Sequence, residues 1–162
     1  MCWGMGGPSP GHPSLGHPHG PGRADPVARL AGVDRELIAR TVARLYQEQD
    51  TFDWVGVYLV EGDLLVLGPF RGKPTGHDRI PIGRGVCGSV AATGAPEVVP
   101  DVRTRPGHIA CDIATRSEVV VPIARDHQVL GVLDVDSNTL DAFGESELAL
   151  IQQAAREIAE GA

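Results

Sequence analysis

Apolar residues recur at regular spacings from about residue 26 to the end of the 162-residue chain. Near the start of this region they recur at steps of three and four, which is the spacing of one helix face. The positions on this stripe are Leu30, Val33, Leu37, Ile38, Thr41, Val42, Leu45 and Tyr46. Asp34 is a candidate cap for this helix, and Gln49 and Asp50 end it. A second stripe, at Leu148, Ile151, Ala155 and Ile158, predicts a closing helix over 143–159.

Runs of β-branched, aromatic and aliphatic residues predict strands between these two helices. The predicted strands are 54–60, 64–70, 79–82, 97–99, 118–125 and 129–136. The first two join through a turn at 61–63, and the last two join at Asp126 and His127, so both pairs are hairpins. Residues 86–93 predict a small-residue helix closed by Gly94. Residues 101–115 predict a long polar loop.

Consecutive hairpins with helices at both ends predict the α+β class, with a central antiparallel sheet flanked by N- and C-terminal helices. We expect a single domain over 26–162. The first 25 residues hold seven Gly, five Pro and three His, and such a segment buries too little apolar surface to order itself. We therefore predict a disordered tail over 1–25. Its histidines, His12, His17 and His19, could bind a metal loosely, but a plain linker is the favoured interpretation.

The composition excludes several classes of protein. The formal net charge of −7 argues against nucleic-acid binding, which uses clustered Lys and Arg. No apolar run reaches the roughly 20 residues that cross a bilayer, and no signal-peptide pattern opens the chain, so we expect a cytoplasmic protein without membrane association. There is no Walker loop and no GxGxxG motif after a strand, so we expect no cofactor. Cys2, Cys87 and Cys111 are too few for a disulfide framework.

Two of the cysteines have settings that permit chemistry. Cys111 lies in a loop with Gly and Pro, and His108, three residues earlier, could stabilise its thiolate. On spacing alone a structural role is favoured. Cys87 begins the predicted helix at 86–93, where backbone N–H groups favour anions. The turn at Val86 to Ser89 could bind a carboxylate or acidify the thiol, although a small buried residue in a tight turn is the slightly favoured interpretation.

Three acids interrupt strands that are otherwise apolar, namely Glu118, Asp134 and Asp136. Asp134 and Asp136 share one face because side chains alternate along a strand. An odd hairpin loop places Glu118 opposite Asp136, whereas an even loop turns it away. A solvated sheet face is the favoured interpretation of the pattern alone. Clustered, the three carboxyl groups would suit an ammonium group, a metal or proton donation. The acids and His108 match no standard metal-ligand spacing, so we expect no metal.

Trp54 and Tyr58 are four residues apart in a predicted strand and therefore share a face. Aromatic residues at such positions are usually core residues. They could instead form the wall of a pocket for a small thioether-like group.

The order of these features resembles the free methionine-(R)-sulfoxide reductases, a family built on the GAF domain. The resemblance rests on six segments and covers about 34–159. The segments are DWVGVYL at 53–59, LGPFRGK at 67–73, IGRGVCG at 82–88, PGHIACD at 106–112, RSEVVVP at 116–122 and GVLDVDS at 131–137.

The resemblance implies a GAF fold and reduction of free methionine-(R)-sulfoxide. It implies that the Cys111 thiolate attacks the sulfoxide sulfur, that methionine leaves, and that thioredoxin reduces the disulfide formed afterwards. Glu118, Asp134 and Asp136 match the pocket acids of the family. The implied substrate contacts are Trp54 and Tyr58 at the methylsulfinyl end and Val86, Gly88 and Ser89 at the carboxylate. The resemblance also makes a homodimer plausible and links the protein to oxidative stress.

One departure bears on turnover. The family has a further cysteine, its usual resolving thiol, in the loop that here reads GKPTGHDR at 72–79 without cysteine. Cys87, a small thiol or thioredoxin itself could take over that role, and Cys2 is a remote candidate. The alternative to an enzyme is a non-catalytic GAF module that senses a small amino-acid-like ligand. The acids together with Cys111 favour the enzyme.

Overall fold

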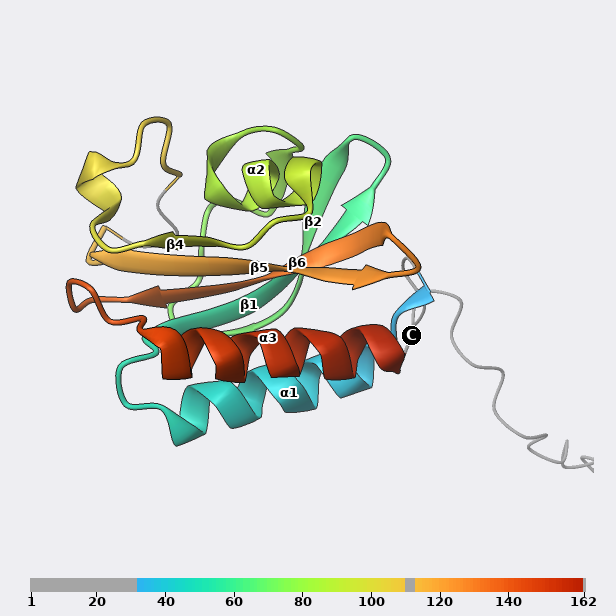
Figure 1. Ribbon diagram of the computed structural model, residues 1–162, viewed down its shortest axis with the longest axis horizontal. Coiled ribbons are helices and arrows are strands. Elements are labelled where there is room, and N and C mark those ends of the chain that lie inside the picture. Colours follow the sequence, from blue (N-terminus) through green and yellow to red (C-terminus); the bar gives the residue numbers. More distant parts are fainter. Residues whose placement is uncertain (1–31, 110–112, 162) are drawn as a thin grey trace, which may run out of the picture.

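The computed structural model describes residues 32–109 and 113–161 of the chain, and Figure 1 shows their arrangement. Six strands form one sheet in the order β3-β2-β1-β6-β5-β4, and every neighbouring pair is antiparallel. The strands are β1 (Trp54–Glu61), β2 (Leu64–Arg71), β3 (Arg79–Pro81), β4 (Glu97–Val99), β5 (Ser117–Arg125) and β6 (Gln128–Ser137). The two long hairpins, β1–β2 and β5–β6, therefore meet at the centre of the sheet through β1 and β6.

Helices cover both faces of this sheet. The helices α1 (Arg35–Glu48) and α3 (Glu145–Glu160) lie side by side on one face. The shorter helix α2 (Gly85–Thr93) packs on the opposite face against β5 and β6 (Figure 1). A short 3₁₀ turn, η3 (Val102–Thr104), lies within the region that the sequence predicts as a continuous loop.

The ends of the helices follow from local hydrogen bonds. The Asp34 carboxylate accepts from the backbone N–H groups of Glu36 and Leu37, which makes it the cap that the sequence predicts. The helix α3 begins at Glu145, two residues later than predicted, because the Glu147 side chain reaches back to the N–H of Gly144. Tyr46, placed on the apolar stripe, is 38% exposed and lies outside the buried face of α1.

Burial on both faces explains why β1 is apolar almost throughout. Alternate strand residues enter a core under α1 and α3, which includes Val55, Val57 and Leu133. The intervening residues enter a second core around α2, which includes Trp54 and Tyr58. A strand residue on either face is therefore buried, which bears directly on the acids of β5 and β6.

The register of the β5–β6 hairpin depends on one extra residue. Asp126 and His127 form a two-residue turn with positive φ angles of 52° and 62°, and Arg125 pairs with Gln128. The register then shifts between Ile123 and Ala124, so that Leu130 is left over in β6. The bulge, rather than the length of the turn, restores the pairing in which Glu118 faces Asp136.

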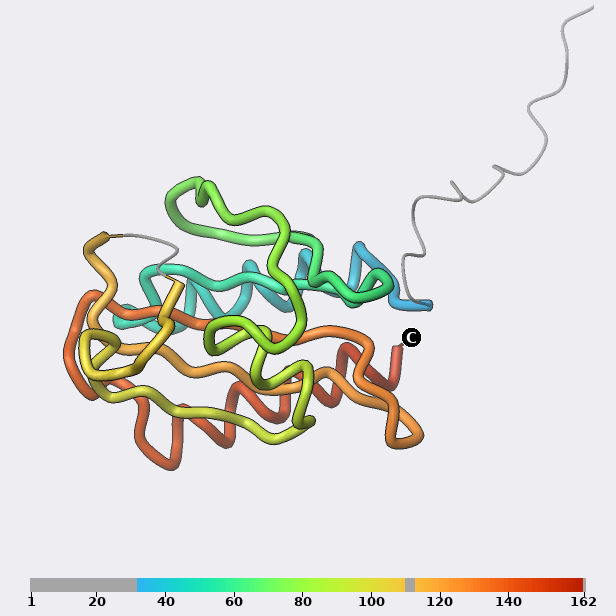
Figure 2. The backbone as a smooth tube through the Cα atoms, turned by 90° about the horizontal axis from the view of Figure 1, so that it is seen from above, coloured from blue at the N-terminus to red at the C-terminus, as the bar shows by residue number. Residues whose placement is uncertain are grey.

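The predicted α+β architecture, with its antiparallel sheet between N- and C-terminal helices, is confirmed. The predicted tail over 1–25 and the start of order near residue 26 lie outside the described residues. Among the described residues, no helix is long and apolar enough to span a membrane. The start of the described residues and the C-terminal end lie at the same end of the molecule (Figure 2).

Candidate active site

The three acids lie together on the face of the sheet that α2 covers. Glu118 pairs with Asp136 across the hairpin, while Trp54 and Gly56 of β1 pair with Asp136 and Asp134. The exposed fractions of Glu118, Asp134 and Asp136 are 2%, 0% and 1%. The interpretation of these acids as residues of a solvated sheet face is therefore wrong. Buried carboxyl groups are costly, and their concentration on one face marks a site.

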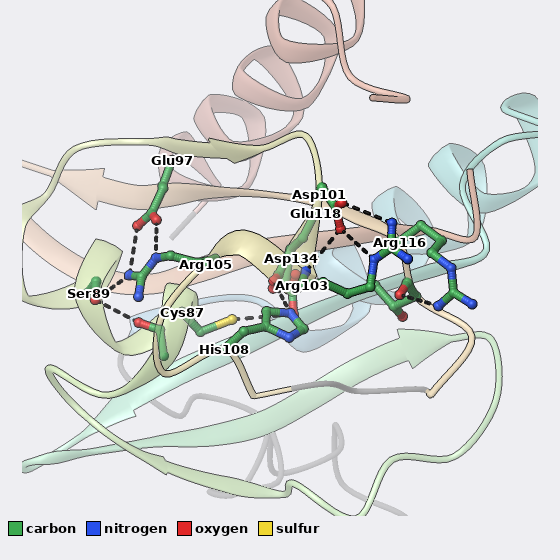
Figure 3. Close-up of polar contacts among 12 residues, drawn as sticks. Cys87, Ser89, Glu97, Asp101, Arg103, Arg105, His108, Arg116, Glu118 and Asp134 are labelled. Atoms are coloured by element: carbon green, nitrogen blue, oxygen red, sulfur yellow. Dashed lines mark hydrogen bonds and ion pairs between the residues drawn. The ribbon is translucent and has the colours of Figure 1, made fainter. Parts of the chain in front are cut away.

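A chain of polar contacts runs through this cluster (Figure 3). Nε2 of His108 lies 2.8 Å from Oε2 of Glu118. A side-chain hydrogen bond joins Glu118 to Asp134 and requires a proton on one of the two carboxyl groups. The Cys87 thiol, at the start of α2, donates to Oδ2 of Asp134 over 3.3 Å. The contacts thus link a loop histidine, two strand acids and a helix thiol.

The surroundings of Glu118 favour its neutral form. Burial and then the nearby Asp136 raise the pKa of Glu118 well above its usual value, and Glu97 adds to this effect. The hydrogen bond between Glu118 and Asp134 and the charge of Arg105 act in the opposite direction. Glu118 is therefore a buried carboxyl group that holds a proton more strongly than a free glutamic acid does, as a proton donor requires.

His108 has a partner that the sequence does not suggest. Its imidazole contacts Glu118, and burial and the charge of Arg105 lower its pKa. Its expected partner, Cys111, lies outside the described residues, as does Cys2. The sequence carries no signal for the contact with Glu118, because the two residues come from separate segments whose positions only the tertiary fold relates.

The two aromatic residues are core residues with polar tips that hold a neighbouring loop. Trp54 and Tyr58 stack at a centroid separation of 6.3 Å, and Trp54 stacks on Phe70 at 5.7 Å. The indole N–H donates to the carbonyl of Lys73, and the Tyr58 hydroxyl donates to the carbonyl of His77. These two hydrogen bonds hold the loop at 72–79 against the face of the sheet that carries the acids.

The turn before α2 is largely occupied by its own hydrogen bonds. The N–H of Gly88 donates to the carbonyl of Arg84, so it is not available to a ligand in this arrangement. Ser89 donates to the carbonyl of Gly85 and accepts from Nη2 of Arg105. Val86, also predicted to contact substrate, is a buried residue of the core around α2.

Arg105 is a residue that the sequence interpretation missed. Its Nε lies 2.6 Å from Oε1 of Glu97, and its guanidinium also contacts Ser89 (Figure 3). With Arg84 it lines an open cavity of about 450 Å³ beside the start of α2. A single arginine in a polar loop carries no spacing signal that predicts contacts with Glu97 and Ser89 or a place beside a cavity.

The space next to the acids is much smaller. A cavity of about 10 Å³ lies among Ile80, Val86, Cys87, Ile109, Glu118 and the backbone start of α2. This volume is about that of one water molecule, so the acid pocket is closed in this structure.

One group of buried side chains is compact enough to share a metal ion. One donor atom each from Cys87, Glu118 and Asp134 lies within 4.8 Å of the others. These groups already exchange hydrogen bonds with one another, and their arrangement serves proton transfer equally well.

The fold and the site together define a class of protein. Residues 27–161 match the GAF domain family, and the chain belongs to that family. The helices α1 and α3 on one face of the sheet and the enclosed polar cluster on the other accord with this assignment.

Within this family the chain is related to the free methionine-R-sulfoxide reductases. It is 46% identical to the free methionine-R-sulfoxide reductase of Escherichia coli over 110 residues, which cover 68% of this chain and 66% of that protein. The structure of the Neisseria meningitidis enzyme in complex with its substrate matches at 43% identity and a TM-score of 0.73, covering 76% of this chain and 74% of that one. The reduced enzyme of Staphylococcus aureus matches at 40% identity and a TM-score of 0.72, covering 76% and 80%.

Proposed function

We propose that this protein reduces free methionine-(R)-sulfoxide to methionine, with Cys111 as the nucleophile and Glu118 as the proton donor. The observation that carries the proposal is the buried cluster of Glu118, Asp134 and Asp136, in which burial and Asp136 raise the pKa of Glu118 well above its usual value. The identity of 46% to an enzyme of this activity supports it. Chain connectivity also supports it, since three residues keep the Cα atoms of Cys111 and His108 within about 11 Å of each other.

In the chemical step, the Cys111 thiolate attacks the sulfoxide sulfur while Glu118 gives a proton to the sulfoxide oxygen. The sulfoxide S–O bond breaks, methionine leaves as the thioether, and the oxygen is transferred to Cys111, which becomes a sulfenic acid. The sulfoxide sulfur is reduced by two electrons and the cysteine sulfur is oxidised by two. A protonated acid beside the oxygen lowers the barrier because the oxygen gains negative charge during the attack.

Selectivity for the free amino acid follows from its two charged ends. The acids of β5 and β6 provide negative charge for the ammonium group, and Asp134 and Asp136 are the candidates. The carboxylate is assigned to the arginine-lined side of α2, near Ser89 and Arg105. A methionine sulfoxide within a peptide has neither charged end and leaves these buried groups without partners. Trp54 and Tyr58 form the wall of the pocket next to the methylsulfinyl end of the substrate.

Recycling requires a second thiol, and Cys87 is the candidate that we propose. Its thiol proton already points at the Asp134 carboxylate, which is a base within hydrogen-bond reach. Attack of the Cys87 sulfur on the sulfenic acid forms a disulfide and releases the oxygen as water. Thioredoxin then reduces this disulfide by thiol exchange. Such a cycle suits the cytoplasm, where thiols are kept reduced, and a role under oxidative stress.

The test is a single-turnover assay with fully reduced protein and free methionine-(R)-sulfoxide, in which methionine released per chain is counted. Wild type is compared with Cys111→Ser and Glu118→Gln. We expect one methionine from each wild-type chain, none from Cys111→Ser, and slow release from Glu118→Gln. The S epimer and a peptide containing methionine sulfoxide serve as substrate controls.

Release of no methionine by the wild type would contradict the proposal. Binding of the sulfoxide, measured by titration calorimetry, would then identify a GAF module that senses an amino-acid-like ligand. Release by Cys111→Ser equal to that of the wild type would instead exclude Cys111 as the nucleophile.

A further inference from the structure

His108 covers the most strongly perturbed acid of the site. It belongs to the segment between η3 and β5, whereas Glu118 belongs to β5 itself. Their side chains are only 10% and 3% exposed, and 2.8 Å separates Nε2 from Oε2. The imidazole therefore occupies a position on the carboxyl group that water would otherwise take.

The segment that carries His108 is fixed on both sides of that residue. On one side, Arg105 pairs with Glu97 of β4 and donates to Ser89 of α2. On the other, Ile109 packs on the backbone of Gly85 so closely that a Cβ added to Gly85 would lie 3.1 Å from the isoleucine side chain. Gly85 also has a φ of 64°, which favours glycine. His108 is thus held against Glu118 by contacts on α2 and β4.

Charged and titratable groups face Glu118 from several elements. Asp134 and Asp136 face it from β6, Cys87 from α2, Glu97 from β4, and Arg105 and His108 from the segment before β5. In an ion pair the histidine pKa rises and the glutamate pKa falls, but here the shifts run in the opposite directions. Both shifts favour the neutral form of each group, so the surroundings do not stabilise this contact as an ion pair.

We propose that His108 is a positioning residue that seals the acid pocket, excludes water from Glu118 and holds its carboxyl group in the protonated, proton-donating state. The role rests on the proposed function for its chemical purpose. The sealing itself is a property of the free protein and is measurable without substrate.

Two substitutions separate sealing from other roles. His108→Ala removes the imidazole and admits water, so it weakens the desolvation that keeps Glu118 protonated. His108→Gln retains much of the volume and keeps a group that can hydrogen-bond Oε2, but it does not titrate. His127→Asn is the matched control. His127 lies in the exposed turn of the β5–β6 hairpin, and Asn tolerates the positive φ of that position.

The first readout is the titration of the Glu118 carboxyl carbon by NMR in reduced protein, with Glu118→Gln used to assign the resonance. We expect the wild-type group to keep its proton to a higher pH than a free glutamic acid does. In His108→Ala the midpoint moves down by about one pH unit or more, whereas His108→Gln and His127→Asn stay near the wild type. The second readout is methionine release against pH, whose alkaline limb moves with the titration. At pH values above this alkaline limb, moving the limb down by one pH unit lowers the rate about tenfold.

The outcomes are distinct. A wild-type Glu118 that titrates as a free glutamic acid does overturns the proposal, even if His108→Ala does not fold. A loss of rate in His108→Ala with an unmoved titration and limb also overturns it, because the role is then structural. Equal effects of Ala and Gln overturn it in favour of a histidine that itself titrates. If no variant releases methionine but the titration behaves as expected, the proposed function fails and the sealing role stands.

Discussion

Replacing Glu118 with Gln changes how the stability of this fold depends on pH. In the native state Glu118 is 2% exposed, and its pKa is raised by burial and by Asp136. In the unfolded chain the same group has an ordinary pKa near 4.3. Between the two values, the native state keeps a proton that the unfolded state has lost. Stability therefore falls as pH rises through this window, and above the native pKa the penalty is constant.

The magnitude follows from one proton. Inside the window the free energy of unfolding drops by about 1.4 kcal/mol for each pH unit. His108 acts at lower pH, because its lowered pKa removes stability as pH falls below about 6.5. Above pH 6.5 its imidazole is neutral in both states. The Glu118 contribution spans the interval between its ordinary pKa and its raised native pKa, and Glu118→Gln removes it.

The assay is urea unfolding followed by circular dichroism at half-unit steps from pH 5 to pH 8. The quantity of interest is the difference in unfolding free energy between Glu118→Gln and the wild type. We expect this difference to shift in favour of the variant as pH rises and then to level off. Glu61→Gln, at an exposed acid at the end of β1, is the matched control substitution. A difference for Glu118→Gln that is constant across the range would refute the assignment of a raised native pKa.

Three further substitutions test other parts of the structure. Gly56→Ala places a Cβ inside the ring of Trp54, which is held by stacking on Phe70, and should lower the unfolding free energy by about 1–3 kcal/mol in urea titrations. Asp34→Ala removes two hydrogen bonds at the start of α1 and should cost about 1 kcal/mol, read from the same titrations; an unchanged midpoint would contradict the capping role. Cys87→Ser should leave the single-turnover yield of methionine unchanged but slow thioredoxin-driven turnover in an NADPH-coupled assay. Undiminished turnover would exclude Cys87 as the resolving thiol.

Local patterns predicted the helices and strands well because their causes are local. The stripe after Asp34 gave the helix at 35–48 because an apolar face recurs every three or four residues. The predicted start of α3 was two residues too early. The hydrogen bond between the Glu147 side chain and Gly144 is a contact that apolar periodicity does not report. The exposure of Tyr46 was missed for a related reason, because the width of the buried face depends on what packs against the helix.

The acids illustrate the limit of such patterns. Alternation alone put Asp134 and Asp136 on one face, but the position of Glu118 depended on the parity of the hairpin. The deciding element is the bulge between Ile123 and Ala124, next to Pro122. Proline is a residue type that occurs at bulges, but by itself it does not fix the register. The preference for a solvated face failed because the strand pattern does not show that α2 covers that side.

By itself, the sequence determined the α+β class, the elements, the family resemblance and the identity of the acids, because these depend on residue type and spacing along the chain. Only the tertiary structure decided that the acids are buried, that Cys87 donates to Asp134, and that His108 and Arg105 close the pocket from a separate segment. The raised pKa of Glu118 belongs to the second group. A pKa depends on solvent exclusion and on charges that meet only when the sheet is paired and covered.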